Sequence, residues 1–344
     1  MDTLIEDFHY VLLPENIEGT PREIRLGRRD LSRMLVIDRA ACTQIHSMVC
    51  ELPRWISKGD VLILNNSKRI PGVLKGRTVV GGLVELRFVD IEGEQAGLCR
   101  IFPMHDIKLG SIIALQGGGS IKVIELGVTK YELARVQAEN DSLRQFLRSQ
   151  GLPISGFFYE GHWTAGQLNP YFASEEGSVE SPLAGLHFTP ELVRELESAG
   201  IEVCFITLHS VGSWLPFLEK RVVEHKMWPE YFSIPDATAA AIRRARARGG
   251  KVFACGSTSL RALEAGATQG REVAAMSGRT DLYITPGYEF RVVDAYFTNF
   301  HQYQTSLIVL DAAFGGGEIV MNAYREASKL HYSFYEFGDA VLYI

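Results

Sequence analysis

The feature that most constrains the fold is a change in the pattern of apolar residues along the sequence. From about residue 181, apolar strand-like runs alternate with segments of helical periodicity. Strands are expected at 201–209, 251–256, 280–284 and 290–297, and helices at 236–250, 258–267, 305–315 and 318–330. Such alternation is typical of an α/β layer in which helices pack on a mostly parallel sheet.

A different pattern occupies the middle of the first half. After an apolar run at 61–64, residues 71–136 break into short β-rich pieces separated by glycine or charged turns. Short strands with regular turn signals are typical of a small antiparallel barrel or sandwich. We therefore predict an α/β main domain, formed by 1–70 and 152–344, interrupted by an inserted antiparallel β-barrel domain at 71–151.

Composition limits the classes of protein. With 344 residues, 46% hydrophobic and 22% charged, the chain is long enough for two domains and is typical of a globular protein. The first 15 residues are acidic, and no run of 18 apolar residues occurs. We therefore expect a cytoplasmic protein without a membrane partner. The net charge of −6 provides no global attraction to nucleic acid.

Several common chemistries leave no mark in the sequence. It contains no Walker loop, no Gly-x-Gly-x-x-Gly, no His-Glu-x-x-His and no Gly-x-Ser-x-Gly. The five cysteines are far apart and include no Cys-x-x-Cys pair: Cys42, Cys50, Cys99, Cys204 and Cys255. We expect no disulfide framework, no metal site and no permanently bound cofactor.

Polar residues follow several of the expected strands, and ligands bind at strand ends in open α/β sheets. His209 ends one apolar run, and the turn 256–259 follows a strand and opens a helix, as a cradle for a polar or carboxylate group would. Asp281, Asp294, Asn299 and His301 cluster in 280–301. Each position also has a structural explanation, because serines cap helices and aspartates satisfy turns.

Two histidines have ambiguous local contexts. His187 precedes a helix start formed by Thr189 as N-cap and Pro190 at the first position, with Gly200 at the end, and local sequence alone favours a structural histidine. His225 follows Glu224, which is a weak sign of a polarised pair. A basic run at 243–248 has helical spacing and is expected on a solvated face.

Read together, these stretches resemble the S-adenosylmethionine:tRNA ribosyltransferase-isomerase family of queuosine biosynthesis. The matching blocks occur in family order across nearly the whole chain: "RDLSRMLVIDR" (29–39), "GDVLILNNSKRIPG" (59–72), "AGLHFTPELVRELESAGIEVCFITLH" (184–209), "EHKM" (224–227), "ACGSTSLRALEA" (254–265), "TDLYITPGYEFRVVDAYFTNFH" (280–301) and the terminal "YEFGDAVLYI". The resemblance implies an α/β domain interrupted by a small β-barrel, with the active site between them.

The resemblance also implies S-adenosylmethionine as co-substrate and an unusual reaction. Its ribosyl part is transferred to an aminomethyl-deazaguanine base in tRNA, with release of adenine and methionine. The sulfonium acidifies the C5′ protons, so a base can remove one, adenine can leave, and an amine can add to the unsaturated sulfonium. In this context His187, too, becomes a site candidate.

Site residues follow from the matching blocks. The base candidates are His187, His209, His225 and His301. Groups expected around the sulfonium are Tyr288, Phe290, Asp281 and Asp294, because aromatic faces and carboxylates hold cations. The further substrate-binding candidates are Arg33, Asn65, Lys68, Ser257, Thr258, Ser259, Arg261 and Asn299.

The sequence departs from the family pattern at three loops, 65–73, 210–218 and 302–306. Asn66 and Val73 replace an aspartate and an arginine, Lys68 replaces an arginine, and Trp228 replaces a second histidine; the loop after His209 is altered at Trp214 and Pro216. Three functions therefore stay open. They are the family reaction on tRNA, a paralogue that uses S-adenosylmethionine with a small-molecule acceptor or as a lyase, and a non-catalytic nucleoside- or RNA-binding protein.

Overall fold

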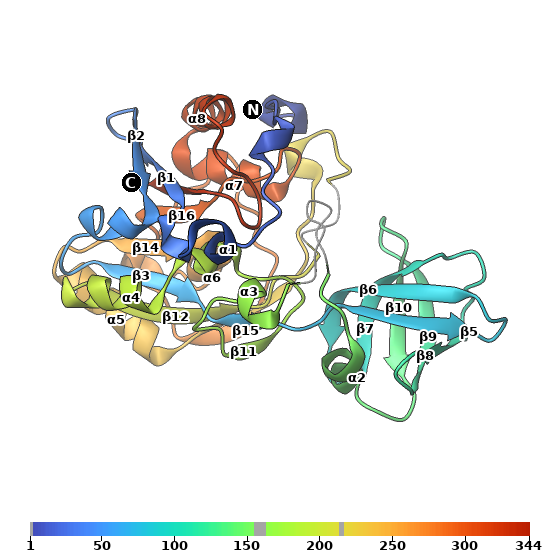
Figure 1. The fold of residues 1–344 in the computed structure, drawn as a ribbon. Coiled ribbons are helices and arrows are strands. Elements are labelled where there is room, and N and C mark those ends of the chain that lie inside the picture. The colour runs from blue at the N-terminus through green and yellow to red at the C-terminus, as the bar shows by residue number, and fades with distance from the viewer. Residues whose placement is uncertain (1–2, 155–162, 213–216) are drawn as a thin grey trace.

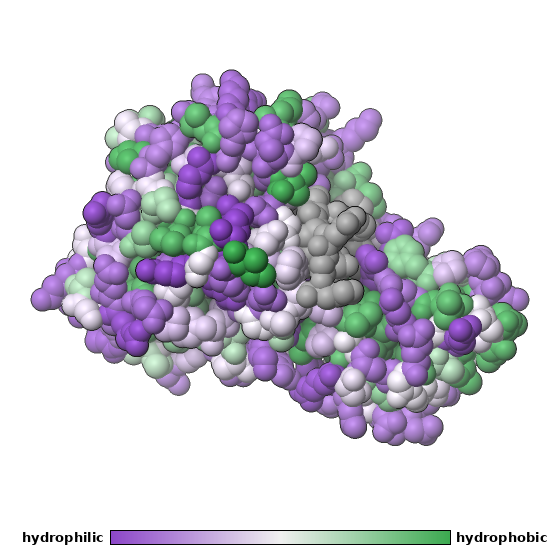
Figure 2. Space-filling model, in the orientation of Figure 1, coloured by the Kyte–Doolittle hydropathy of each residue, from purple (hydrophilic) through white to green (hydrophobic). Residues whose placement is uncertain are grey.

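The computed structural model describes residues 3–154, 163–212 and 217–344. A main body carries both ends of the described chain, and a smaller barrel projects from one side of it (Figure 1). The altered positions Trp214 and Pro216 lie outside the described residues. In the space-filling view, hydrophilic residues cover most of the visible face of both parts, with apolar residues scattered among them (Figure 2).

The main body is built on a nine-stranded sheet with the order β15-β13-β12-β3-β14-β16-β17-β1-β2. The strands are β1 (Arg33–Asp38), β2 (Thr43–Met48), β3 (Val61–Asn65), β12 (Glu202–Leu208), β13 (Glu230–Ile234), β14 (Val252–Cys255), β15 (Met276–Thr280), β16 (Ala295–Asn299) and β17 (Ala340–Tyr343). The pairs β12/β3, β3/β14, β14/β16 and β17/β1 are parallel. The other neighbouring pairs are antiparallel, so the expectation of a mostly parallel sheet was wrong.

Helices cover both faces of this sheet. The α-helices of the main body are α1 (Arg22–Leu26), α3 (Ala165–Leu168), α4 (Pro190–Ser198), α5 (Asp236–Ala247), α6 (Gly256–Ala265), α7 (Ser306–Gly315) and α8 (Gly317–Lys329), whereas α2 (Leu143–Gln150) packs on the barrel. Short 3₁₀ turns are η1 (Ile5–Phe8), η2 (Pro14–Asn16), η3 (Arg29–Leu31), η4 (Val49–Arg54), η5 (Leu183–His187), η6 (Val222–Glu224) and η7 (Gln269–Arg271).

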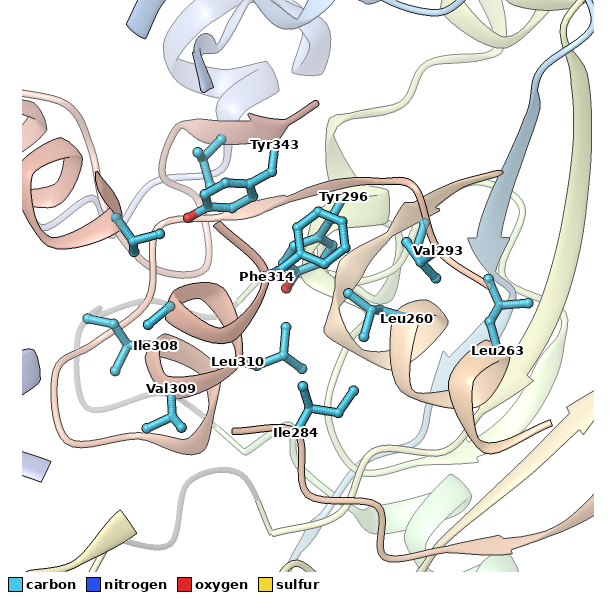
Figure 3. Close-up of a cluster of buried hydrophobic side chains, with 14 of the residues drawn as sticks. Leu260, Leu263, Ile284, Val293, Tyr296, Ile308, Val309, Leu310, Phe314 and Tyr343 are labelled. Atoms are coloured by element: carbon cyan, nitrogen blue, oxygen red, sulfur yellow. The ribbon is translucent and has the colours of Figure 1, made fainter. Parts of the chain in front are cut away.

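Strand β3 shows how the two faces divide the core. Val61 and Ile63 belong to the cluster formed with α5, α6, α7 and α8, whereas Leu62 and Leu64 belong to the cluster formed with α4. Alternate residues of a strand point to opposite faces, so a fully apolar run is what a strand covered on both sides requires. Figure 3 shows side chains of α6 and α7 meeting in the first of these clusters, among them Leu260 and Leu310.

Helix α4 begins as its sequence predicts. The Thr189 side chain accepts a hydrogen bond from the Leu192 amide at 3.1 Å, Pro190 is the first helical residue, and Gly200 takes a left-handed φ of +84° just beyond the end. Glycine adopts that conformation without the steric cost that a side chain brings. Capping chemistry therefore predicted this helix well.

The inserted segment forms a closed antiparallel barrel with the order β10-β7-β6-β5-β8-β9, which confirms the predicted fold class. Its strands are β5 (Val73–Thr78), β6 (Leu83–Glu92), β7 (Ala96–Phe102), β8 (Ile112–Leu115), β9 (Ser120–Val128) and β10 (Leu133–Ala138). The boundary at 71–151 stays a prediction. A small parallel pair, β4 (Ser67–Arg69) with β11 (Glu175–Ser178), lies beside the entry to the barrel.

Two expected strands are displaced. The strand expected at 290–297 is β16, which begins only at Ala295 and runs to Asn299. The run 280–284 was predicted as a strand, but β15 ends at Thr280 and residues 281–284 have no regular structure. Among the described residues, no single helix is long and apolar enough to cross a membrane; only the pair α7 and α8, bent by 117°, meets the length and composition requirements together.

Candidate active site

Four parallel strands bring their carboxyl ends to one edge of the main sheet. His209 follows β12, Asn65 ends β3, the turn to α6 follows β14, and Asn299 ends β16. The Asn65 side chain links three of these ends, since its Nδ2 donates to the Leu208 carbonyl at 2.9 Å and to Thr258 Oγ1 at 3.0 Å. Hydrogen bonds of one side chain therefore join the ends of β3 and β12 to the start of α6 at the edge where the sequence predicts ligand binding.

A cavity lies at this edge, between the main body and the barrel. It has a volume of about 60 Å³, which is room for a few water molecules at roughly 30 Å³ each. Four of the predicted site residues line it, His225, Ser257, Thr258 and Arg261. The rest of its lining is Tyr131, Ser210, Val211, Gly212, Phe217, Met227, Trp228, Glu230, Thr305, Ser306 and Leu307.

The first turn of α6 lies at the wall of this cavity. Gly256 opens the helix with a left-handed φ of +84°, and Cys255 supplies no side-chain cap. The first amides of an uncapped helix have no intrahelical acceptor and carry the positive end of the helix dipole. Ser257 and Thr258 add hydroxyl groups at the cavity wall, so this wall suits an anionic group.

Arg261 adds a buried cation one turn further along α6. Its Nε donates to the Leu282 carbonyl at 3.0 Å, and its Nη1 forms an ion pair with the Glu230 carboxylate. The other Glu230 oxygen accepts from the Val211 amide at 2.9 Å. Arg261 Nη2, in contrast, has no hydrogen-bond partner among the described residues, although the residue is only 5% exposed. A buried donor without a partner is costly, and a carboxylate in the cavity would satisfy it.

His225 forms another wall of the cavity. Its Nδ1 lies 3.0 Å from Glu219 Oε2, and its ring stacks on Phe217 with the centroids 4.2 Å apart. A carboxylate only accepts, so Nδ1 carries the hydrogen and Nε2 keeps its lone pair. Burial, and next the positive charge of Lys130, lower the pKa of His225 to about 4. The ring is therefore neutral and able to accept a proton at neutral pH.

The carboxylate partner of His225 is not the adjacent one. Glu224 pairs with Arg221 at 3.3 Å, whereas Glu219, six residues before the histidine, contacts the imidazole. The Glu224–His225 pair suggested by the sequence is therefore not formed; Glu219 contacts this histidine instead, and the catalytic role of His225 stays a prediction.

His209 lies at the same edge but does not line the cavity. Its Nδ1 is 2.8 Å from Ser67 Oγ, and its ring stacks on Tyr231 with the centroids 5.4 Å apart. A Cβ on Gly177 would lie 2.5 Å from the ring, so only glycine fits there. Burial, with Arg144 as the smaller cause, lowers the pKa of His209 to about 4.

His187 is fully buried away from the cavity. Its Nε2 accepts from Arg22 Nη2 at 3.0 Å, and its Nδ1 has no partner among the described residues. Arg22 is buried as well, and its Nε donates to the Gly338 carbonyl at 2.9 Å. Burial and then the Arg22 charge lower the pKa of His187 well below its usual range.

His301 is also enclosed by protein. Its Nε2 is 3.0 Å from Thr298 Oγ1, and burial lowers its pKa to about 3. Asp311 lies beneath it, 3.9 Å away, and burial raises the pKa of that carboxyl to about 8. Thus three of the four predicted base candidates do not face the cavity, and their catalytic role stays a prediction.

The structure places the remaining predicted residues apart from the cavity. Asp294 precedes β16 at the opposite edge and pairs with Arg246 and Arg271. Tyr288 donates to Glu264 at 3.2 Å, and Phe290 packs on Phe314. Five more predicted residues do not line the cavity. Arg33 lies beside Asp339 and Lys68 beside Glu176. Ser259 is buried in α6, Asn299 donates to the Tyr335 carbonyl, and Asp281 is exposed. Their assignments stay predictions.

Several lining residues were not singled out from the sequence. Tyr131 comes from the barrel, and its ring lies 6.2 Å from that of Trp228. Glu230 pairs with Arg261, and Glu219 contacts His225 behind the cavity wall. These partners come together only in the folded chain. Trp228, Ser210 and Ser306 line the cavity and lie where the sequence departs from the family pattern. That departure is the sequence signal that could have identified them as lining residues. Among the described residues, no group of three or more His, Cys, Asp or Glu side chains is arranged to hold a metal ion.

Comparisons with known proteins give one consistent result. A family model described as queuosine biosynthesis protein matches residues 5–343. The chain is 37% identical over 343 residues to the S-adenosylmethionine:tRNA ribosyltransferase-isomerase of Citrifermentans bemidjiense, with 98% of both chains covered. It is 34% identical over 339 residues to the protein of that name from Thermotoga maritima, covering 98% of this chain and 99% of the relative.

A solved structure agrees with these sequence matches. The crystal structure of the Thermotoga maritima S-adenosylmethionine tRNA ribosyltransferase aligns with a TM-score of 0.56 and 30% identity, over 98% of this chain and 100% of that one. The names of these relatives are enzyme names. They support neither the small-molecule acceptor nor the non-catalytic binding protein among the three open functions.

Proposed function

Because the chain belongs to the queuosine biosynthesis protein family, we propose that it transfers the ribosyl part of S-adenosylmethionine to a 7-aminomethyl-7-deazaguanine base in tRNA, at the cavity between main body and barrel. The observation that carries the proposal is the meeting of two complementary groups in one cavity. Within the described ranges, His225 Nε2 forms no hydrogen bond and the buried Arg261 Nη2 has no acceptor, and both residues line the cavity.

The proposed roles follow from this chemistry. His225 Nε2 removes a C5′ proton next to the sulfonium, adenine leaves by elimination, and the amine of the tRNA base adds to the unsaturated sulfonium. Methionine then leaves as a neutral thioether when an oxygen of the ribosyl part displaces it and the carbon–sulfur bond breaks. Arg261 Nη2 and the first turn of α6 hold the methionine carboxylate. The rings of Tyr131, Phe217 and Trp228 offer faces to the sulfonium cation.

Ligand entry requires movement of the lining. Small-molecule sites usually have a volume of about 300 to 1,000 Å³, far above the cavity volume of about 60 Å³. We therefore propose that binding displaces large side chains such as Trp228, and that Trp228→Phe removes most of the tryptophan fluorescence change seen on titration with S-adenosylmethionine.

The decisive experiment incubates the protein with S-adenosylmethionine and tRNA bearing the aminomethyl-deazaguanine base. Mass spectrometry should detect adenine, methionine and the ribosylated nucleoside in equal amounts. Binding of S-adenosylmethionine with no release of adenine would contradict the proposed reaction. Adenine release that proceeds equally without tRNA would contradict the proposed acceptor.

A further inference from the structure

The turn between β9 and β10 joins the barrel to the histidine side of the cavity. Lys130 in this turn forms an ion pair with Glu219 Oε1, while Glu219 Oε2 contacts His225 Nδ1 at 3.0 Å. One carboxylate of the main body therefore bridges a cation of the barrel and the imidazole. Its side chain is 15% exposed, and that of His225 is 12% exposed. The Lys130 side chain is 37% exposed, so its ion pair with Glu219 lies at the surface, whereas the contact between Glu219 and His225 is largely shielded from water.

Two residues of this turn have an unfavourable backbone conformation. Thr129 and Glu132 have left-handed φ values of +64° and +52°, and neither is glycine. A β-branched residue seldom adopts positive φ, and such conformations persist where surrounding contacts over-determine them. Between these two residues the turn presents Lys130 to Glu219 and Tyr131 to the cavity.

We propose that Glu219 and Lys130 are positioning residues: Glu219 fixes the His225 tautomer that leaves Nε2 free, and the docked barrel turn holds the Glu219 carboxylate in place through Lys130. The proposal rests on the proposed function, because it assigns how the base of that reaction is prepared. The barrel then contributes to catalysis indirectly, through one charge placed against a carboxylate of the main body.

The chemistry of the bridge has defined consequences. When Nε2 accepts a proton, the imidazolium donates from Nδ1 to Glu219, so the carboxylate stabilises the cation that forms. Lys130 acts in the opposite direction on the histidine, because its ammonium disfavours a second positive charge nearby. The other groups that face His225 are Tyr283 and Phe217, with Arg261 and Glu230 lining the same cavity.

Two variants separate these contributions. Glu219→Gln keeps the size of the side chain but removes its charge, and should lower the kcat for adenine release roughly 100-fold, as loss of a histidine-orienting partner commonly does. Lys130→Met should lower kcat only severalfold. The acid limb of kcat/KM should move to lower pH in Glu219→Gln and to higher pH in Lys130→Met, because the two charges act oppositely on the imidazole.

The chain offers a matched control. Arg279 of β15 pairs with Asp90 of β6 at 2.8 Å and so forms another ion pair between main body and barrel; it also donates to the Pro229 carbonyl at 2.6 Å. Arg279→Met also removes a long cationic side chain. It should leave kcat within twofold of that of the unmodified protein and should not shift the acid limb of kcat/KM. Equal effects of Lys130→Met and Arg279→Met would overturn the proposal, since both would then act only by loosening the barrel.

A readout independent of turnover keeps the test separate from the proposed function. Nitrogen-15 shifts of the histidine rings at neutral pH, with His225 assigned from a His225→Gln spectrum, should show the Nδ1–H tautomer. In Glu219→Gln the signal should shift towards a mixture of tautomers. An unchanged tautomer overturns the positioning role even if the enzyme is active, whereas a changed tautomer in a protein that never releases adenine contradicts only the proposed reaction.

Discussion

His225 and His187 both hold one ring nitrogen against a charged side chain, yet the two neighbours carry opposite charges and occupy different ring nitrogens. At His225, whose side chain lines the cavity, the partner is the Glu219 carboxylate, which accepts the Nδ1 hydrogen bond and leaves the lone pair on Nε2. At His187 the partner is the Arg22 guanidinium, which occupies the Nε2 lone pair in the core. The sign of the neighbour therefore decides whether a buried imidazole can accept a proton.

The largest expected effect is on the rate at His225. His225→Gln should reduce adenine release about 1,000-fold, because a general base typically contributes 10²- to 10⁴-fold. The midpoint of thermal unfolding should change little, because the ring already faces a cavity. Single-turnover assays with calorimetry on the same preparation would show both; retention of more than a tenth of the rate would remove His225 from the role of base.

His187 should show the reverse behaviour. His187→Leu removes the acceptor of a buried guanidinium, which should lower the free energy of unfolding by about 2 to 3 kcal/mol. The fraction that stays folded should retain most of its activity per molecule. Urea unfolding gives the first quantity and active-site titration the second. A stable variant without activity would restore His187 as a catalytic candidate.

The pH dependence of stability tests a third histidine. The pKa of His209 is about 4 in the folded protein and about 6.5 when unfolded, so the unfolded state binds the proton first. Stability should fall as the pH is lowered from 6.5 to 4, and be unaffected by this group above 6.5. His209→Gln should reduce that acid-side loss by about 2 kcal/mol. Urea midpoints at pH 7 and pH 4.5, measured for both proteins, provide the check.

The smallest effect concerns recognition by Arg261. Arg261→Lys keeps the charge but loses the planar fork that serves Glu230 and the cavity together, so the Kd for S-adenosylmethionine should rise about tenfold. Asp294→Asn, at the opposite edge of the sheet, is the control and should leave that Kd within twofold. If titration calorimetry instead shows the larger effect at Asp294, the binding role expected from its sequence block would be correct.

Much of the fold could be predicted because local chemistry and tertiary structure agree. The cap at Thr189 and the alternating barrel strands need no distant partner to be recognised. The strand expected at 280–284 failed for the converse reason. β15 pairs with β13 only as far as Thr280 opposite Glu230, and beyond it Leu282 accepts from Arg261 while Tyr283 packs on His225. Tertiary contacts there override β propensity.

The candidate site was harder to predict, because its polar groups are paired across long distances in the sequence. Ser257, Thr258 and Arg261 lie within about one turn at the start of a helix that follows a strand, so the sequence could predict that they lie close together. Glu219 and Lys130 are 89 positions apart, and no periodicity links them. The histidines matched their sequence blocks equally well, and only the sign and position of their neighbours separates them.

The way in which the barrel joins the main body has a consequence for the history of the chain. The entering and leaving segments lie side by side, with the Val73 amide donating to the Leu152 carbonyl at 3.0 Å and the Leu152 amide donating back at 2.8 Å. A module whose two ends meet at one point can be gained or lost in a single insertion or deletion, because a short turn can close the gap it leaves. An ancestral enzyme without the barrel would have lacked the charge opposite Glu219, and so would have carried out its proton transfer with a less constrained histidine.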